Sequence, residues 1–117
     1  MPHPWLTTND VTTDRAYAVP ATRVFAEAEA ACRALPRWTV TKTDPVGNTL
    51  SAEVRTAFGG FTDDVTVSVV PDGPDAARVT VRSRSRVGRG DLGENARHIR
   101  ALQKAMDERL PRAQEQP

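Results

Sequence analysis

The apolar residues of this chain repeat with two different periods, and the order of the two periods restricts the fold. Between residues 21 and 35 they recur every three to four positions, as on one face of an α-helix. Between residues 38 and 82 they occupy alternate positions in four separate runs, which is typical of β-strands. The helical period returns at residues 92–110, and a short alternating run at 15–19 precedes the first helix. We therefore expect the order strand, helix, four strands, helix.

This order is typical of the α+β class, with one antiparallel sheet and two helices packed on one face of it. Turn-forming residues at 44–48 and 71–75 divide the four consecutive strands into two hairpins. With 117 residues the chain is close to the usual size of one domain. We expect an irregular leader at residues 1–14, a single α+β domain at 15–110 and a frayed tail at 111–117.

Alternation also predicts which residues face each other, because a shift by one residue would turn every apolar side chain to the wrong face. The second hairpin then pairs Asp63 with Ser85 on the inner side, where Ser83 also points. It pairs Asp64 with Arg84 on the outer side. The expected apolar pairs are Trp38 with Val54, Val40 with Ala52, Val67 with Val81 and Val69 with Val79.

The inward position of Asp63 predicts a buried polar group beneath the helices. An unpaired buried carboxylate would cost several kcal/mol, so we expect partners from Arg89, Asn95 or the backbone N–H groups of the second helix. No second group is evidently placed to complete a catalytic mechanism, so we assign no catalytic residue. The residues of this expected structural cluster are Asp63, Asp64, Ser83 and Ser85.

The last strand carries a stripe of arginines on its outer side. Residues 78–104 hold eight basic and two acidic side chains, whereas the whole chain has a net charge of +1. Arginine forks beside a glycine turn and a helix N-terminus can bind phosphate or carboxylate. The alternative interpretation is a solvated face with cross-strand ion pairs. The residues of the candidate anion site are Arg84, Arg86, Arg89, Asp91 and Asn95.

Other signals argue against several classes of function. Cys32 is the one cysteine, so an internal disulfide is excluded, and its position on the apolar helical face indicates a core side chain. His3 and His98 lack partners at metal-ligand spacing, so we expect no metal and no cofactor. The outer face has no aromatic residue for base stacking, which argues against nucleic acid. No apolar run is long enough to cross a membrane, and we expect a cytoplasmic protein.

Two segments carry a more specific pattern. Residues 61–67 read Phe-Thr-Asp-Asp-Val-Thr-Val, and residues 83–96 read Ser-Arg-Ser-Arg-Val-Gly-Arg-Gly-Asp-Leu-Gly-Glu-Asn-Ala. Together they resemble the uncharacterised bacterial and plastid family called domain of unknown function 1499, over roughly residues 15–110. The resemblance implies a shared polar cluster and no particular activity.

These signals favour a small cytosolic, non-enzymatic domain of unknown function. Its expected role is to bind a small anionic ligand or a protein partner, near the arginine-rich strand and the N-terminus of the second helix. One alternative is a ligand carrier or enzyme with an apolar pocket between sheet and helices. The other is a homodimeric interaction module joined through a sheet edge.

Overall fold

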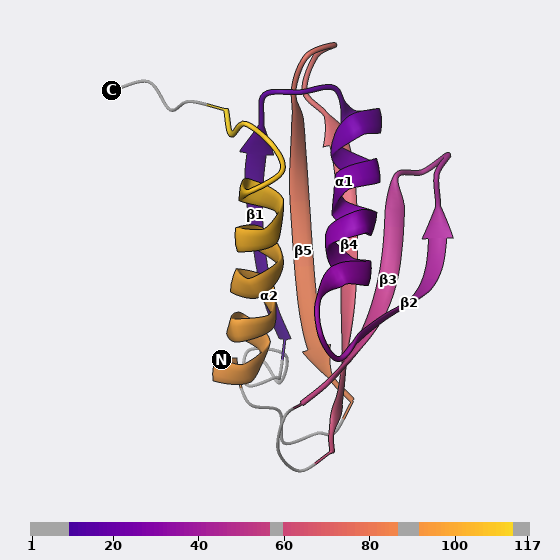
Figure 1. Cartoon of the computed structure of the whole chain (residues 1–117), viewed down its shortest axis with the longest axis vertical. Coiled ribbons are helices and arrows are strands. Elements are labelled where there is room, and N and C mark those ends of the chain that lie inside the picture. The colour runs from indigo at the N-terminus through magenta and orange to yellow at the C-terminus, as the bar shows by residue number, and fades with distance from the viewer. Residues whose placement is uncertain (1–9, 57–59, 87–91, 114–117) are drawn as a thin grey trace, which may run out of the picture.

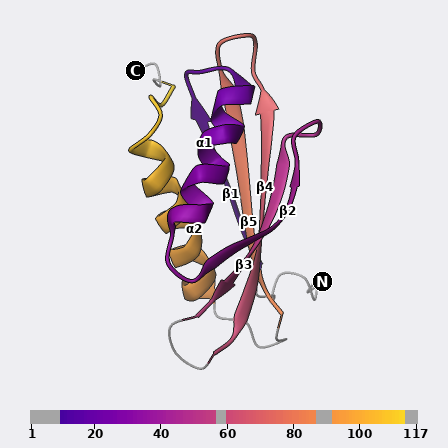
Figure 2. The same cartoon turned by 45° about the vertical axis from the view of Figure 1, so that its right-hand side comes forward.

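The expected order of elements is confirmed in a computed structural model that describes residues 10–56, 60–86 and 92–113. The strands in this part of the chain form one antiparallel sheet in the order β1-β5-β4-β3-β2. Both helices cover the same face of the sheet (Figures 1 and 2). The elements are β1 (Asp10–Tyr17), α1 (Ala21–Ala34), β2 (Trp38–Asp44), β3 (Thr49–Arg55), β4 (Thr62–Pro71), β5 (Ala77–Ser85) and α2 (Leu92–Asp107).

The strand registers follow the apolar alternation. All four expected apolar pairs are present, and Asp63 lies opposite Ser85. The alternation stops in β2, where a bulge after Val40 places Lys42 opposite Ser51. The side chain of Thr41 donates a hydrogen bond to the carbonyl oxygen of Ser51 at 3.3 Å. The bulge interrupts the regular pairing of this edge strand, whose residues beyond Val40 are exposed.

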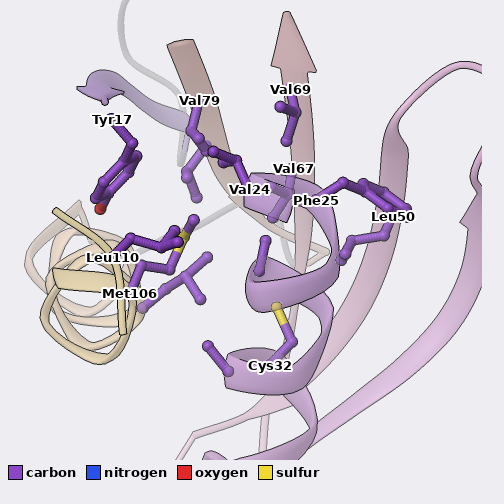
Figure 3. Packing of buried hydrophobic residues seen from close by; sticks show 14 of the residues in the cluster. Tyr17, Val24, Phe25, Cys32, Leu50, Val67, Val69, Val79, Met106 and Leu110 are labelled. Carbon is purple, nitrogen blue, oxygen red and sulfur yellow. The ribbon is translucent and has the colours of Figure 1, made fainter. Parts of the chain in front are cut away.

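The apolar core fills the space between the sheet and the two helices (Figure 3). The inner sides of β3, β4 and β5 supply mostly valines, which suit a pleated surface. In α1, Val24 and Ala28 lie one helical turn apart and are fully buried. In α2, Leu102 and Met106 are likewise one turn apart and buried. Each large apolar side chain buried in this way contributes roughly 1.5–3 kcal/mol of transfer free energy.

Two boundaries differ from those expected. β1 begins at Asp10, inside the segment expected to be an irregular leader, and it pairs with β5 over its full length. Its first half reads Asp-Val-Thr-Thr, so its sequence carries almost no apolar alternation and the pairing of its backbone decides the strand. The expected tail also makes contacts, because the N–H of Ala18 donates to the carbonyl of Pro111 at 2.9 Å and that of Ala113 to Ala16 at 3.1 Å.

The connection from α1 to β2 contains a residue in the left-handed region. α1 ends at Ala34 because Pro36 follows and Leu35 is already extended. Arg37 then has φ of 68°, which lets its carbonyl accept a hydrogen bond from the N–H of Arg55 at 3.0 Å. A side chain in this conformation costs roughly 1–2 kcal/mol relative to glycine.

The left-handed conformation of Arg37 can be tested by glycine substitution, which should have opposite effects on stability at position 37 and at a helical control position. Arg37→Gly should be more stable than Arg37→Ala by about 1 kcal/mol, because only glycine adopts a positive φ without a Cβ clash. At the exposed helical residue Ala26, replacement by glycine should lower the free energy of unfolding by about 1 kcal/mol. Urea denaturation of the variants measures both differences. Glycine less stable than alanine at position 37 would contradict the left-handed conformation.

Candidate functional site

Polar side chains are buried together at one end of the space between the sheet and α2. They come from the start of β4, the end of β5 and the first half of α2, which meet at the end of the sheet where β5 finishes (Figure 1). The exposed fractions of these residues range from 0 to 9%. The buried polar cluster, as we call it below, consists of Asp63, Ser83, Ser85, Asn95 and His98.

Asn95 joins α2 to β5 through two side-chain hydrogen bonds. The hydroxyl of Ser83 donates to Oδ1 of Asn95 at 2.6 Å, and Nδ2 of Asn95 donates to Oγ of Ser85 at 3.0 Å. The two serines share the inner side of β5 because they are two residues apart in a strand. One amide therefore spans both of them, and the helix is held at a fixed position over the strand.

His98 joins α2 to β4 by a hydrogen bond to Asp63. Nε2 of the imidazole lies 2.9 Å from Oδ2 of Asp63, and the two side chains are 8% and 3% exposed. Oε2 of Glu94, one turn earlier on the helix, is 3.9 Å from the same nitrogen. The ring of Trp38 stands edge-on to the imidazole, with centroids 6.4 Å apart at an angle of 85°.

In a neutral imidazole this arrangement leaves one ring nitrogen as a hydrogen-bond acceptor. A carboxylate accepts hydrogen bonds, so a neutral imidazole donates to Asp63 from Nε2 and keeps its lone pair on Nδ1. Within the described residues, the polar contacts of His98 all run through Nε2. No fully buried side-chain nitrogen or oxygen in that part of the chain lacks a partner, so Nδ1 retains some access. His98 thus presents a hydrogen-bond acceptor from a largely buried ring.

The described side-chain partner of Asp63 is His98, which was not among the expected candidates. Asn95, one of the expected candidates, is occupied by the two serines, and His98 supplies the hydrogen bond instead. His98 has no histidine or cysteine at metal-ligand spacing on its own helix, so metal-site patterns in the sequence do not single it out. A usable signal was present, since the inward Asp63 required a donor and His98 follows the core-facing Asn95 by three residues. Arg89, another expected partner, lies outside the described residues.

The candidate anion site is divided between the two faces of the sheet. Arg84 and Arg86 are exposed on the outer side, whereas Asn95 is fully buried on the inner side. Arg89 and Asp91 fall outside the described residues. Within the described part of the chain, the five candidate residues therefore do not form one surface.

Arg86 is held by two carboxylates of the outer face. Its guanidinium donates to both oxygens of Asp64 at 2.9 Å and to Glu53 at 2.6 Å. The hydrogen bonds to Asp64, and then those to Glu53, raise the pKa of Arg86 further above its ordinary value. Asp64 thus pairs with Arg86, although Arg84 is the residue directly opposite it in the sheet. This contact matches the alternative interpretation of the stripe, a solvated face with ion pairs.

Some arrangements that would indicate other chemistry are not found in the described residues. No group of three or more histidine, cysteine, aspartate or glutamate side chains there could hold a metal ion. None of the helices in that part of the chain is long and apolar enough to cross a membrane.

Cys32 is a core side chain, as its place on the apolar face of α1 predicted. It is fully buried, and burial raises the pKa of its thiol to about 12. The thiolate is the reactive form, so the folded protein should react with Ellman's reagent at pH 8 only as fast as it unfolds. Labelling in urea should be complete within the mixing time. Rapid labelling without denaturant would show that Cys32 is accessible.

The cluster also predicts unequal effects at the adjacent aspartates. Asp63→Ala leaves His98 without its buried acceptor and should lower the free energy of unfolding by about 1–3 kcal/mol. Asp64→Ala is the matched control, because it removes an exposed ion pair and should cost less than about 1 kcal/mol. Urea denaturation at pH 7 compares the two. Equal losses would contradict a stabilising role of the buried contact.

The fold is shared with several solved structures of low sequence identity. The di-domain ARO/CYC StfQ from the steffimycin biosynthetic pathway aligns over 84% of this chain with a TM-score of 0.65 and 11% identity; the chain spans 44% of that protein. Norcoclaurine synthase from Thalictrum flavum aligns over 88% of this chain and 87% of its own, with a TM-score of 0.58 and 12% identity. A START superfamily protein from Mycobacterium smegmatis aligns over 86% and 96%, with a TM-score of 0.54 and 14% identity.

At these identities the likeness shows the fold alone, an α+β arrangement with helices on one face of an antiparallel sheet. No curated protein matches the sequence. The family described as a protein of unknown function, DUF1499, matches residues 6–106, which include every element of the sheet and nearly all of α2. The chain therefore belongs to the DUF1499 family.

Proposed function

We propose that this domain binds a small, largely apolar molecule that carries a hydroxyl or N–H group, at the buried polar cluster between the sheet and α2. The observation that carries the proposal is His98, whose side chain is 8% exposed while its Nδ1 has no partner among the described residues. Nδ1 retains some access, so the hydrogen-bond donor of a ligand can reach this acceptor.

The polarity of the site limits the ligand. In the neutral imidazole the contact with Asp63 leaves Nδ1 as the acceptor, so the ligand group that meets it there donates. The ring of Trp38 beside His98, together with the apolar residues of the core, favours an aromatic or aliphatic body. Recognition by one convergent polar group inside an apolar wall is typical of small-molecule sites.

The fold comparison supports the same class of function. Norcoclaurine synthase was solved in complex with dopamine and hydroxybenzaldehyde, both of which are small aromatic molecules with hydroxyl groups. We extend to this chain only the binding of such a molecule. We propose no catalytic step for the domain, and we propose that it acts in the cytoplasm.

The test uses Trp38 as a reporter, with Trp5→Phe as background so that one tryptophan remains. We expect 4-hydroxybenzaldehyde to change the Trp38 fluorescence with saturation, and benzaldehyde, which lacks the donor, to bind about tenfold more weakly. His98→Gln should reduce binding of the hydroxylated probe to the level of benzaldehyde. This variant keeps a side-chain N–H for Asp63 but lacks the second ring nitrogen, so its fold should persist.

Three results would contradict the proposal. These are no saturable change with either aldehyde, equal binding of both aldehydes, or unchanged binding in His98→Gln. Asp64→Ala serves as the control, since it removes an ion pair of the outer face and leaves the contact of the imidazole with Asp63 in place, so binding of the hydroxylated probe should not change. Inorganic phosphate is the third probe. A response to phosphate alone, abolished by Arg84→Gln, would instead support the arginine-rich outer face as the ligand site.

A further inference from the structure

The second half of α2 borders a groove that is separate from the buried polar cluster. α2 lies along β1 at one edge of the sheet (Figures 1 and 2), and the groove between them has a volume of about 430 Å³. Three of its side chains are cationic and two are anionic, which leaves an excess of one positive charge. The lining residues are Arg15, Arg100, Gln103, Lys104, Asp107 and Glu108.

One cation of the groove is fixed in place by a chain of contacts from the core. The hydroxyl of Tyr17, which is fully buried, donates to Oδ1 of Asp107 at 2.7 Å. Burial, and then this hydrogen bond, raise the pKa of the Tyr17 phenol above its ordinary value, so it remains a donor. Oδ2 of Asp107 accepts from Nη1 of Arg15 at 2.5 Å. A guanidinium has five N–H groups, so Arg15 keeps donors for a second anion.

Two further cations face the same groove from α2. Arg100 and Lys104 are exposed and four residues apart, so they lie one above the other on the helix surface. No carboxylate of the described residues lies within ion-pair distance of either of them. The other described arginines of α2 and its C-terminal turn differ, since Arg97 pairs with Glu94 and Arg109 with Glu27. Among the described residues, the cationic side chains of α2 without an ion pair, Arg100 and Lys104, therefore both line the groove.

A buried amide in the wall is the independent sign of a ligand. Gln103 is 8% exposed, and its side chain makes no hydrogen bond within the described residues. Its amide atoms are not sealed in the core, because every fully buried side-chain nitrogen and oxygen of the described residues has a partner. The amide therefore meets the groove, where it can donate two hydrogen bonds to an anion held by the cations.

We propose that this groove is a second binding site, for a small organic anion that carries a carboxylate or a phosphate. Arg15 and Arg100 supply forked donors, Lys104 supplies a point charge and Gln103 supplies a neutral donor at the wall. The volume is large enough for a small molecule. The proposal is independent of the site at His98, because it uses the other half of α2 and a charged rather than a largely apolar ligand.

The test follows the side-chain NH₂ signals of Gln103 by NMR during separate titrations with citrate and with inorganic phosphate, at constant ionic strength. We expect at least one of the two anions to shift these signals with saturation, and the tighter of the two identifies the charged group. The double variant Arg100→Gln and Lys104→Gln should weaken that binding by about tenfold or more. Gln103→Met should weaken it about threefold to tenfold without removing the cations; this variant lacks the Gln103 NH₂ signals, so its titration follows the backbone amide signals of Arg100 and Lys104.

Arg23→Gln is the matched control, because Arg23 is another exposed arginine with no ion pair in the described residues, on α1 outside the groove. Its effect on the affinity should stay within about twofold. The proposal is overturned if neither anion moves the Gln103 signals. It is also overturned if Arg23→Gln weakens binding as much as the double variant does, since the effect would then follow net charge alone.

Discussion

The register of β4 against β5 is the constraint on which the rest of the structure depends. It pairs Val67 with Val81 and Val69 with Val79, so the inner face is apolar along most of both strands. The same register pairs Asp63 with Ser85, so that face becomes polar where β5 ends. A shift of one residue would bury Asp64 and Arg84 instead and expose the valines. The core and the buried polar cluster are therefore set by one alignment of two strands.

Directional contacts at that polar end fix α2 in a way that apolar packing does not. Asn95 bonds to both serines of β5, and His98 bonds to Asp63 of β4, so the helix is tied to two adjacent strands. Apolar burial drives the association of helix and sheet but specifies little about rotation of the helix about its own axis. Buried ionic and polar contacts are in general weak sources of stability, and their best attested contribution is to register. The cluster satisfies the conditions for such a contribution, since its fully buried atoms are paired.

The sequence predicts the elements, the hairpin registers and the inward side chains, because each follows from the period of apolar residues. It does not predict contacts that depend on how far a side chain reaches. Asp64 bonds to Arg86 rather than to Arg84 opposite it, because a long guanidinium just past the strand end can fold back across two strands. The pairing of His98 with Asp63 likewise depends on the angle to which α2 is rotated about its axis over the sheet. The period of apolar residues shows which face of the helix is buried but not this angle. The alternation of apolar residues predicts neither the bulge in β2 nor the polar first half of β1.

One rotation of α2 also accounts for the separation of its two candidate sites. Successive residues of an α-helix are turned by about 100°, so Arg100 is directed roughly 200° away from His98. Holding His98 over Asp63 therefore turns Arg100 away from the core and toward the groove beside β1. Lys104 lies one turn later on the same side of the helix. Asp107, about one turn further, accepts a hydrogen bond from the hydroxyl of the buried Tyr17. The helix is thus fixed at both ends by polar contacts to different strands, and its unpaired positive charge is confined to the stretch between them.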